Sequence, residues 1–466
     1  MSAARPAPDA PAPEILAPDL LAPDLLAPGP GAREGQPEDA PPAAGLEDGP
    51  VRVLSFGCRL NTYESTAMRA LALRAGHRDA VLVNTCAVTA EAERQARKAI
   101  RRAHREQPGV PILVTGCAAQ ISPSSWAALP GVTRVIGNAD KLKPEAWAPE
   151  AAPAPVTDIM AATETAAHLV TDFAGRARAF VQVQQGCDHR CTFCVIPYGR
   201  GPSRSVPMGA VVEQARALVA RGYNELVLTG VDITSYGPDL PGRPTLGQLA
   251  RRLLALLPEL KRLRLSSLDP VEIDEDLWRL VAEEPRLMPH LHLSLQHGDD
   301  VMLKRMKRRH GRADALACAR RARDLRPGIA LGADLIAGFP TETEAHFARM
   351  LAMVEEAGLH FLHVFPYSER PGTPAARMPQ LPVPLRRERA TRLREAGAAA
   401  ARRFYESRLG QEETVLLERR DRGHTEHFCP VRVELPAGLE PDALHGALLR
   451  LRPHAATPDG LLARVG

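Results

Sequence analysis

Three cysteines lie within eight residues of one segment, which runs Gln185-Gly-Cys-Asp-His-Arg-Cys-Thr-Phe-Cys-Val-Ile-Pro. Thiolates are the ligands of iron–sulfur clusters, so Cys187, Cys191 and Cys194 can hold one metal centre from three sides. No fourth cysteine or histidine follows in register, so a bound cluster would keep one iron with an open position for chemistry. Structural zinc, which takes four protein ligands, is the alternative. His189 lies inside the motif, and we expect it to be a solvated loop residue.

The spacing Cys-x3-Cys-x2-Cys, with Phe193 just before the last thiol, resembles the signature of radical S-adenosylmethionine enzymes. In that superfamily the open iron binds S-adenosylmethionine, and one electron from the cluster cleaves its sulfonium to a 5′-deoxyadenosyl radical. The resemblance implies a 4Fe-4S cluster on the three cysteines, with S-adenosylmethionine as cofactor and Phe193 among its contacts. It leaves the substrate open.

Three further cysteines each follow an apolar run that predicts a buried strand. The runs and their cysteines are 51–56 with Cys58, 80–83 with Cys86 and 110–114 with Cys117. Helical composition between the runs predicts a parallel sheet, whose strand C-termini meet at one edge. Open α/β sheets bind ligands there, so this edge is a second candidate three-thiol site. The alternative is three packed cysteines that happen to follow strands, as we expect for Cys318 and Cys429.

From about 179 to 367 the chain alternates short strands and helices, which predicts a partial (β/α) barrel. The expected strands are 180–183, 225–228, 262–265, 292–295, 332–336 and 360–365. Gly230 and Gln296 follow or end such strands, on the active face of a barrel, and are candidate cofactor contacts; ordinary turn residues are the alternative. His290, His292 and Gln296 share one strand face, which we expect to be packed rather than metal-binding. The basic run 304–310 is expected to be a solvated helix end.

The 466 residues allow about three domains. Residues 1–50, rich in Pro, Ala and acidic side chains, are expected to be a disordered tail. An α/β domain over 51–150, a linker over 151–172 and a barrel core over 173–405 follow. A long helix at about 385–409 leads to a small β-barrel over 406–466, and such barrels commonly bind RNA through a basic, partly aromatic face.

Charge is distributed unevenly along the chain. Residues 1–48 hold two arginines against nine acidic residues, or −7, so the whole-chain +4 leaves +11 for the rest. A basic body is compatible with a nucleic-acid partner. Nothing resembles a signal peptide or a membrane span, and the thiols suit a reducing compartment, so we expect a cytoplasmic protein.

Nearly everything after residue 50 resembles the methylthiotransferase branch of radical S-adenosylmethionine enzymes. The stretches that carry the resemblance are 57–65, 83–89, 115–120, 185–197, 200–204, 338–344, 367–373 and 423–426. The last resembles the TRAM domain, which in this family binds tRNA. Thr341 occupies a position where many relatives have glycine.

The resemblance implies a second 4Fe-4S cluster, held by Cys58, Cys86 and Cys117, whose open iron carries the sulfur to be donated. Residues Arg59-Leu-Asn after Cys58 are most similar to the branch that acts on N6-threonylcarbamoyladenosine at position 37 of the tRNA anticodon loop. The branches that act on N6-isopentenyladenosine or on a ribosomal protein are the alternatives within the family. An electron donor and a sulfur source are implied partners. A non-catalytic zinc-bearing RNA-binding protein is the alternative of another class.

Overall fold

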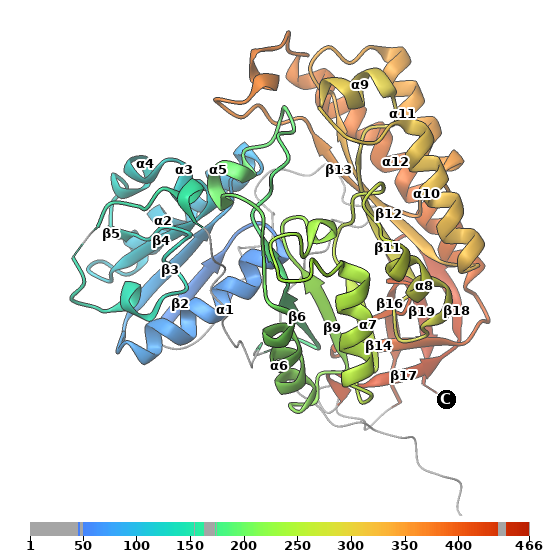
Figure 1. The fold of residues 1–466 in the computed structure, drawn as a ribbon, viewed down its shortest axis with the longest axis horizontal. Helices are drawn as coiled ribbons and strands as arrows, with labels where there is room; N and C mark the ends of the chain where they lie inside the picture. Colours follow the sequence, from blue (N-terminus) through green and yellow to red (C-terminus); the bar gives the residue numbers. More distant parts are fainter. Residues whose placement is uncertain are drawn as a thin grey trace, which may run out of the picture.

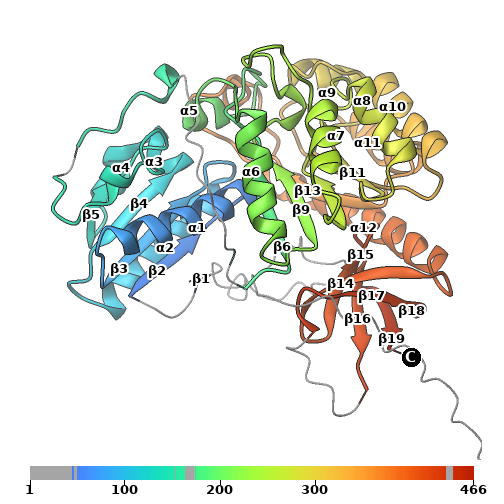
Figure 2. The same cartoon turned by 60° about the horizontal axis from the view of Figure 1, so that its bottom comes forward.

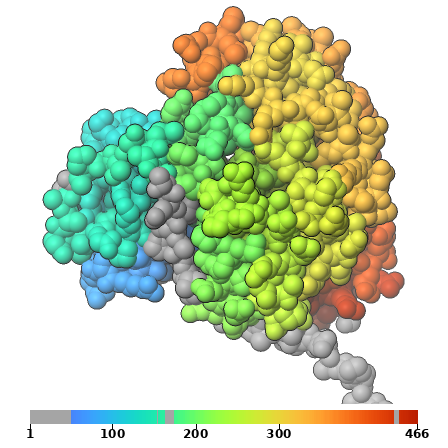
Figure 3. Space-filling view, in the orientation of Figure 1, coloured from blue at the N-terminus to red at the C-terminus, as the bar shows by residue number. Residues whose placement is uncertain are grey.

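The computed structural model describes residues 45–46, 50–152, 154–162, 173, 175–436 and 444–465. Two parallel α/β units and a C-terminal sheet follow one another along the chain (Figure 1). Figure 3 shows the N-terminal unit, blue to teal, lying beside the larger core. Within the described residues, no helix combines the length and the apolar character that crossing a membrane requires.

The N-terminal sheet has the order β1-β2-β3-β4-β5 and is parallel from β2 onward. Its elements are β1 Gly45–Leu46, β2 Val51–Ser55, α1 Arg59–Arg74, β3 Ala80–Thr85, α2 Ala90–Glu106, β4 Ile112–Gly116, α3 Cys117–Ile121, α4 Pro123–Ala127 and β5 Val132–Val135. The predicted alternation is confirmed, and β5 is an additional strand. β1 lies within the segment expected to be disordered and pairs with β2; the rest of that segment lies outside the described residues.

The core is a partial barrel of six parallel strands, as predicted. Strands β6, β9 and β10 form one half and β11, β12 and β13 the other, and two isolated parallel bridges join β10 to β11 through the segments that flank them. The strands are β6 Arg178–Gln182, β9 Glu225–Thr229, β10 Arg262–Leu265, β11 His290–Gln296, β12 Ala330–Ala337 and β13 Phe361–Pro366. The helices are α5 Ile196–Arg200, α6 Met208–Val219, α7 Leu246–Leu256, α8 Glu275–Glu283, α9 Asp300–Arg305, α10 Arg312–Leu325, α11 Glu344–Glu356 and α12 Val383–Ser407. A two-stranded ribbon of β7 Gln184–Gln185 and β8 Arg204–Ser205 brackets the cysteine loop.

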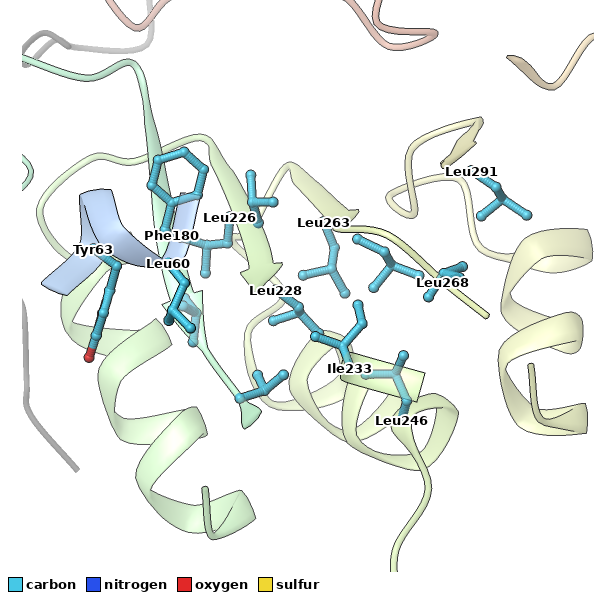
Figure 4. Close-up of a cluster of buried hydrophobic side chains, with 14 of the residues drawn as sticks. Leu60, Tyr63, Phe180, Leu226, Leu228, Ile233, Leu246, Leu263, Leu268 and Leu291 are labelled. Atoms are coloured by element: carbon cyan, nitrogen blue, oxygen red, sulfur yellow. The ribbon is translucent and has the colours of Figure 1, made fainter. Parts of the chain in front are cut away.

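Side chains alternate between two faces of each barrel strand. Leu263, Leu291 and Leu293 point outward into the apolar layer beneath the helices, which Figure 4 shows in part. Leu60 and Tyr63 of α1 join the same layer beside Phe180, so the N-terminal unit packs directly on the barrel. The opposite, inward face carries polar side chains, such as Arg264, His290 and Asp334, as well as apolar ones.

The C-terminal segment is one sheet with the strand order β17-β14-β15-β16-β19-β18. The strands are β14 Glu413–Arg419, β15 Arg422–Thr425, β16 Pro430–Glu434, β17 Leu448–Leu451, β18 Pro453–Thr457 and β19 Gly460–Arg464. The sheet lies below the barrel, next to α12 (Figure 2). It agrees with the predicted small β-barrel, but His424 and His427 are buried, so this part of its aromatic surface faces inward rather than toward solvent.

Thr341 has φ +67°, in the left-handed region. A β-branched residue is strained in that conformation and glycine is not, which explains why glycine is common there in the family. Arg305 Nη1 donates to the Thr341 hydroxyl at 2.7 Å and helps to hold the turn.

Glu225, at the start of β9, is fully buried and contacts three arginines. Its carboxylate lies 2.9 Å from Arg178 Nε, 3.0 Å from Arg264 Nε and 3.4 Å from Arg262 Nη1. Burial opposes ionisation, but these guanidinium groups lower the pKa of Glu225 well below its usual range. Glu225 therefore neutralises much of the positive charge at this end of the barrel.

We expect Glu225→Gln to destabilise the protein by about 3 kcal/mol, because it leaves buried guanidinium groups without their counter-charge. Glu275→Gln is the matched control, since the pair of Glu275 with Arg321 lies on the surface. Urea unfolding followed by circular dichroism measures both variants. Equal midpoints for the two would contradict this account of Glu225.

Candidate functional site

The loop of Cys187, Cys191 and Cys194 follows β6 and β7 at the C-terminal mouth of the barrel. All three thiols are partly buried. The backbone fixes the loop: Cys187 N donates to Gly201 O at 3.1 Å and Cys194 N to Cys191 O at 3.1 Å. The three cysteines predicted to act together thus share one rigid turn.

Gly186 precedes this loop with φ +71°. A Cβ there would lie 1.8 Å from the carbonyl oxygen of Pro202, so only glycine lets the two backbone segments approach.

Cationic and polar groups surround the loop thiols. Arg308 Nη1 donates to Cys191 Sγ at 3.5 Å, and its other nitrogen donates to Asp269 at 2.8 Å. Ile196 N donates to Cys194 Sγ at 3.4 Å, although burial raises the pKa of that thiol to about 12. A bound metal must therefore displace protons, and Arg308 favours the thiolate form. The expectation of a solvated basic run over 304–310 is wrong for Arg308, whose side chain is only 8% exposed.

His189 is not the solvated loop residue that the sequence indicated. Its Nε2 lies 2.9 Å from Asp232 Oδ2 and 3.7 Å from Glu272 Oε2, which come from loops after other strands. Cys187, His189 and Asp232 are close enough to share a metal ion, but they are one ligand short of the four that structural zinc takes. That set leaves Cys191 and Cys194 unused, so the three-thiol arrangement accounts for more of the motif.

Cys58, Cys86 and Cys117 come together at the C-terminal edge of the N-terminal sheet, as predicted. Cys58 precedes α1, Cys86 follows β3 and Cys117 begins α3. Burial, together with the neighbouring Cys58 and Cys117, raises the pKa of Cys86 to about 12. Gly57 makes the approach possible: it has φ +97°, and a Cβ there would lie 2.6 Å from Cys86 Sγ.

The two groups of cysteines face each other. Val195, next to Cys194, packs in the same apolar cluster as Cys86 and Cys117. A Cβ on Gly199 of α5 would lie 3.0 Å from Cys117 Cβ, and the charge of Cys117 contributes to the raised pKa of Cys194. The two groups of cysteines thus lie near each other, and each offers three thiols.

Arg200, at the end of α5, joins the two halves of the site. Its Nε donates to Cys117 Sγ at 3.1 Å, and its Nη groups donate to Gln185 at 2.9 Å and to Glu64 at 2.9 Å. Lys141 Nζ also donates to Glu64, at 2.6 Å, with both side chains fully buried. Burial opposes ionisation of Glu64, yet Arg200 and Lys141 lower its pKa to about 2.

The predicted cofactor contacts also have roles in the fold itself. Phe193 packs edge-on against Phe339 with 6.3 Å between ring centroids, so it anchors the cysteine loop. A Cβ on Gly230 would lie 2.8 Å from Gln184 O. The close approach of this backbone is therefore enough to explain a glycine at position 230, even if no ligand contacts it. Gln296 has φ +67° at a register shift where β11 ends. Strained backbone conformations of this kind are common at binding sites, so Gln296 is still a candidate cofactor contact.

His290 and His292 lie on the inward face of β11, but Gln296 does not join them in a ligand set. His292 Nε2 instead lies 3.0 Å from Asp334, and His363 Nδ1 lies 3.3 Å from the same carboxylate. Cys318 and Cys429 are buried, as expected for packing residues.

Comparison with known proteins agrees with this architecture. Residues 181–354 match the model of the radical SAM superfamily, and residues 50–137 match the uncharacterized protein family UPF0004. The structure is similar to the radical S-adenosylmethionine methyltransferase TsrM from Kitasatospora setae, with TM-score 0.50 and 17% identity over 66% of this chain and 68% of that one. This likeness supports the fold.

Curated relatives indicate a narrower class of enzyme within this superfamily. The chain is 50% identical to the threonylcarbamoyladenosine tRNA methylthiotransferase MtaB of Rickettsia prowazekii, over 82% of this chain and 91% of the relative. It is 37% identical to the tRNA-2-methylthio-N(6)-dimethylallyladenosine synthase of Novosphingobium aromaticivorans, over 79% and 86% of the two chains. The fold and the three-cysteine loop define a radical S-adenosylmethionine enzyme, which uses a 4Fe-4S cluster and S-adenosylmethionine. The chain belongs to the methylthiotransferase family of these enzymes.

In metal-free, reduced protein we expect Cys58 to be alkylated well before Cys318 and Cys429. Cys58 is exposed, whereas the other two are 6% and 0% exposed, so the reagent reaches Cys58 without local opening of the fold. A time course with iodoacetamide, read by peptide mass spectrometry, gives the order. Labelling of Cys429 as early as Cys58 would contradict the packing of the C-terminal sheet.

Proposed function

We propose that this enzyme transfers a methylthio group to C2 of N6-threonylcarbamoyladenosine at position 37 in the anticodon loop of tRNA. The observation that carries the proposal is the pair of three-cysteine sites facing each other in a chain 50% identical to an enzyme named for that substrate. The second candidate is the dimethylallyladenosine reaction for which the 37% identical relative is named.

Cys187, Cys191 and Cys194 would hold the cluster that binds S-adenosylmethionine, and Cys58, Cys86 and Cys117 would hold an auxiliary 4Fe-4S cluster. When bound, these groups supply one-electron cleavage of the sulfonium and a sulfur atom for transfer. Phe193, Gly230 and Gln296 are the proposed contacts of S-adenosylmethionine.

The chain itself contributes positioning. Arg200 and Glu64 fix the N-terminal sheet against the barrel mouth, which sets where the two groups of thiols lie relative to each other. A radical reaction at an aromatic carbon depends on such orientation, and on exclusion of water, more than on a side-chain base. The adenine must leave the stack of the RNA loop to reach this space.

The domain division proposed from the sequence follows the same roles. Residues 51–150 would carry the auxiliary cluster, 173–405 the radical chemistry and 406–466 RNA binding, joined by a linker over 151–172. The RNA surface of the last domain would be its outer arginines, such as Arg422 and Arg432, because the histidines of β15 and the turn after it face inward. An electron donor, a sulfur source and a cytoplasmic location complete the proposal.

Iron content tests the cofactor assignment. After anaerobic reconstitution, replacing Cys58, Cys86 and Cys117 by alanine should remove about half of the iron and sulfide, since one of two similar clusters is lost. Reductive cleavage of S-adenosylmethionine should persist in that variant and disappear when Cys187, Cys191 and Cys194 are replaced. Cys318→Ala is the matched control and should keep all the iron. Binding of zinc instead of iron by the unaltered protein would overturn the assignment.

Nucleoside mass spectrometry tests the substrate. In tRNA from a strain that lacks this gene and any paralogue, 2-methylthio-N6-threonylcarbamoyladenosine should disappear and N6-threonylcarbamoyladenosine should accumulate. The gene supplied in trans should restore the product. Loss of the methylthio group from dimethylallyladenosine instead would favour the second candidate.

A further inference from the structure

Arg59 is a cation without a counter-ion beside the candidate sulfur site. It directly follows Cys58 and begins α1. Among the described residues its guanidinium makes no hydrogen bond and no ion pair, and it lies 5.9 Å from the centroid of the Phe428 ring. The residue as a whole is only partly buried.

The charges around Arg59 leave it without compensation. Arg178 and Arg264, its nearest cationic neighbours, are both paired with Glu225. The carboxylates of Asp334 and Glu225 are already engaged, Asp334 by His292 and Glu225 by Arg264, and neither forms an ion pair with Arg59. A guanidinium in such a setting is stabilised by any anion that binds to it.

The inward face of the barrel next to Arg59 is polar rather than apolar. His290 is 5% exposed, and its Nδ1 has no hydrogen-bond partner among the described residues. His292 and His363 flank Asp334, and the side chains of His363 and Asp334 are 35% and 19% exposed. The interior of a small barrel is normally filled with apolar side chains, so these polar groups are chemically suited to contact a polar ligand.

Phe428, between β15 and β16 of the C-terminal sheet, lies next to these polar side chains. Its ring stacks on His424 at 4.7 Å and lies 5.3 Å from the ring of His290. The guanidinium groups of Arg178 and Arg264 lie 5.2 and 4.8 Å from its centroid. All three parts of the chain therefore meet at Arg59: the N-terminal unit, the barrel and the C-terminal sheet.

We propose that Arg59 binds the carboxylate of the amino-acid substituent on N6 of the substrate adenine, with the imidazoles of His290 and His363 near its polar groups. This inference rests on the proposed function. A threonylcarbamoyl group carries a carboxylate, a hydroxyl and a ureido group, whereas a dimethylallyl group carries no polar atom. Arg59 would thus select between the two substrates for which the relatives are named. A site built to bind a polar group rejects an analogue without it, because its own polar groups then stay unpaired.

The test is a binding measurement on the reconstituted enzyme. The probes are three synthetic anticodon stem-loops with adenosine, N6-threonylcarbamoyladenosine or N6-dimethylallyladenosine at position 37, and fluorescence anisotropy gives each Kd. We expect Arg59→Gln to weaken binding of the threonylcarbamoyl RNA by about tenfold or more, the usual range for a charged hydrogen bond, and to leave the other two RNAs nearly unchanged. Arg59→Lys should keep part of the preference, because it keeps the charge but not the planar fork.

Arg279→Gln, an equal loss of charge at an exposed position of α8, is the matched control and should leave all three affinities unchanged. Iron content and thermal midpoint show whether each variant is folded and loaded. An equal loss for all three RNAs would overturn the proposal and assign Arg59 to a backbone phosphate instead. No loss for any RNA would also overturn it.

The same experiment separates failure of this inference from failure of the proposed function. If the unaltered enzyme shows no preference for the threonylcarbamoyl RNA and does not modify it, the proposed function is wrong. If it prefers and modifies that RNA, and Arg59→Gln keeps the preference, only the role of Arg59 is wrong.

Discussion

The buried contact between Arg200 and Glu64 is the interaction on which the geometry of the site depends. Arg200 belongs to the barrel side and Glu64 to the first helix of the N-terminal unit, and both are almost fully shielded from water. A buried ion pair is worth little for stability against an apolar pair of the same size, but it is costly to break and strongly directional. Here the direction matters, because the same guanidinium donates to Cys117. The network therefore places one group of thiols relative to the other.

The sequence predicted the parts of the fold that depend on local pattern. Apolar runs and the residues that follow them located all six barrel strands to within two residues at each end, and three strands of the N-terminal sheet. The prediction that the cysteines after β2, β3 and β4 lie together was correct, because neighbouring parallel strands end at the same edge of a sheet. Cys187, Cys191 and Cys194 needed no tertiary reasoning, since all three lie in one loop.

What the sequence could not predict depends on partners distant along the chain. The prediction that His189 is solvated was wrong, because its partners Asp232 and Glu272 follow strands later in the barrel. Arg308 lies in a basic run typical of a solvated helix end, and only the fold shows that it reaches Cys191. Lys141 carries no local signal, because its buried partner is 77 residues away. Thr341 was visible as a departure from the family pattern, but its left-handed backbone was not.

The position of Phe428 changes what the C-terminal sheet contributes. Its ring lies over guanidinium and imidazole groups that belong to the other two parts of the chain, at the end of the barrel where the strands begin. The sheet thus covers the end of the barrel where the strands begin, and it is also a candidate RNA-binding surface. An enzyme shortened before β14 would open the polar interior to bulk water and screen its charges. In this architecture, the sheet that covers this end of the barrel also carries the arginines proposed to bind RNA, so one segment of the chain would serve both purposes.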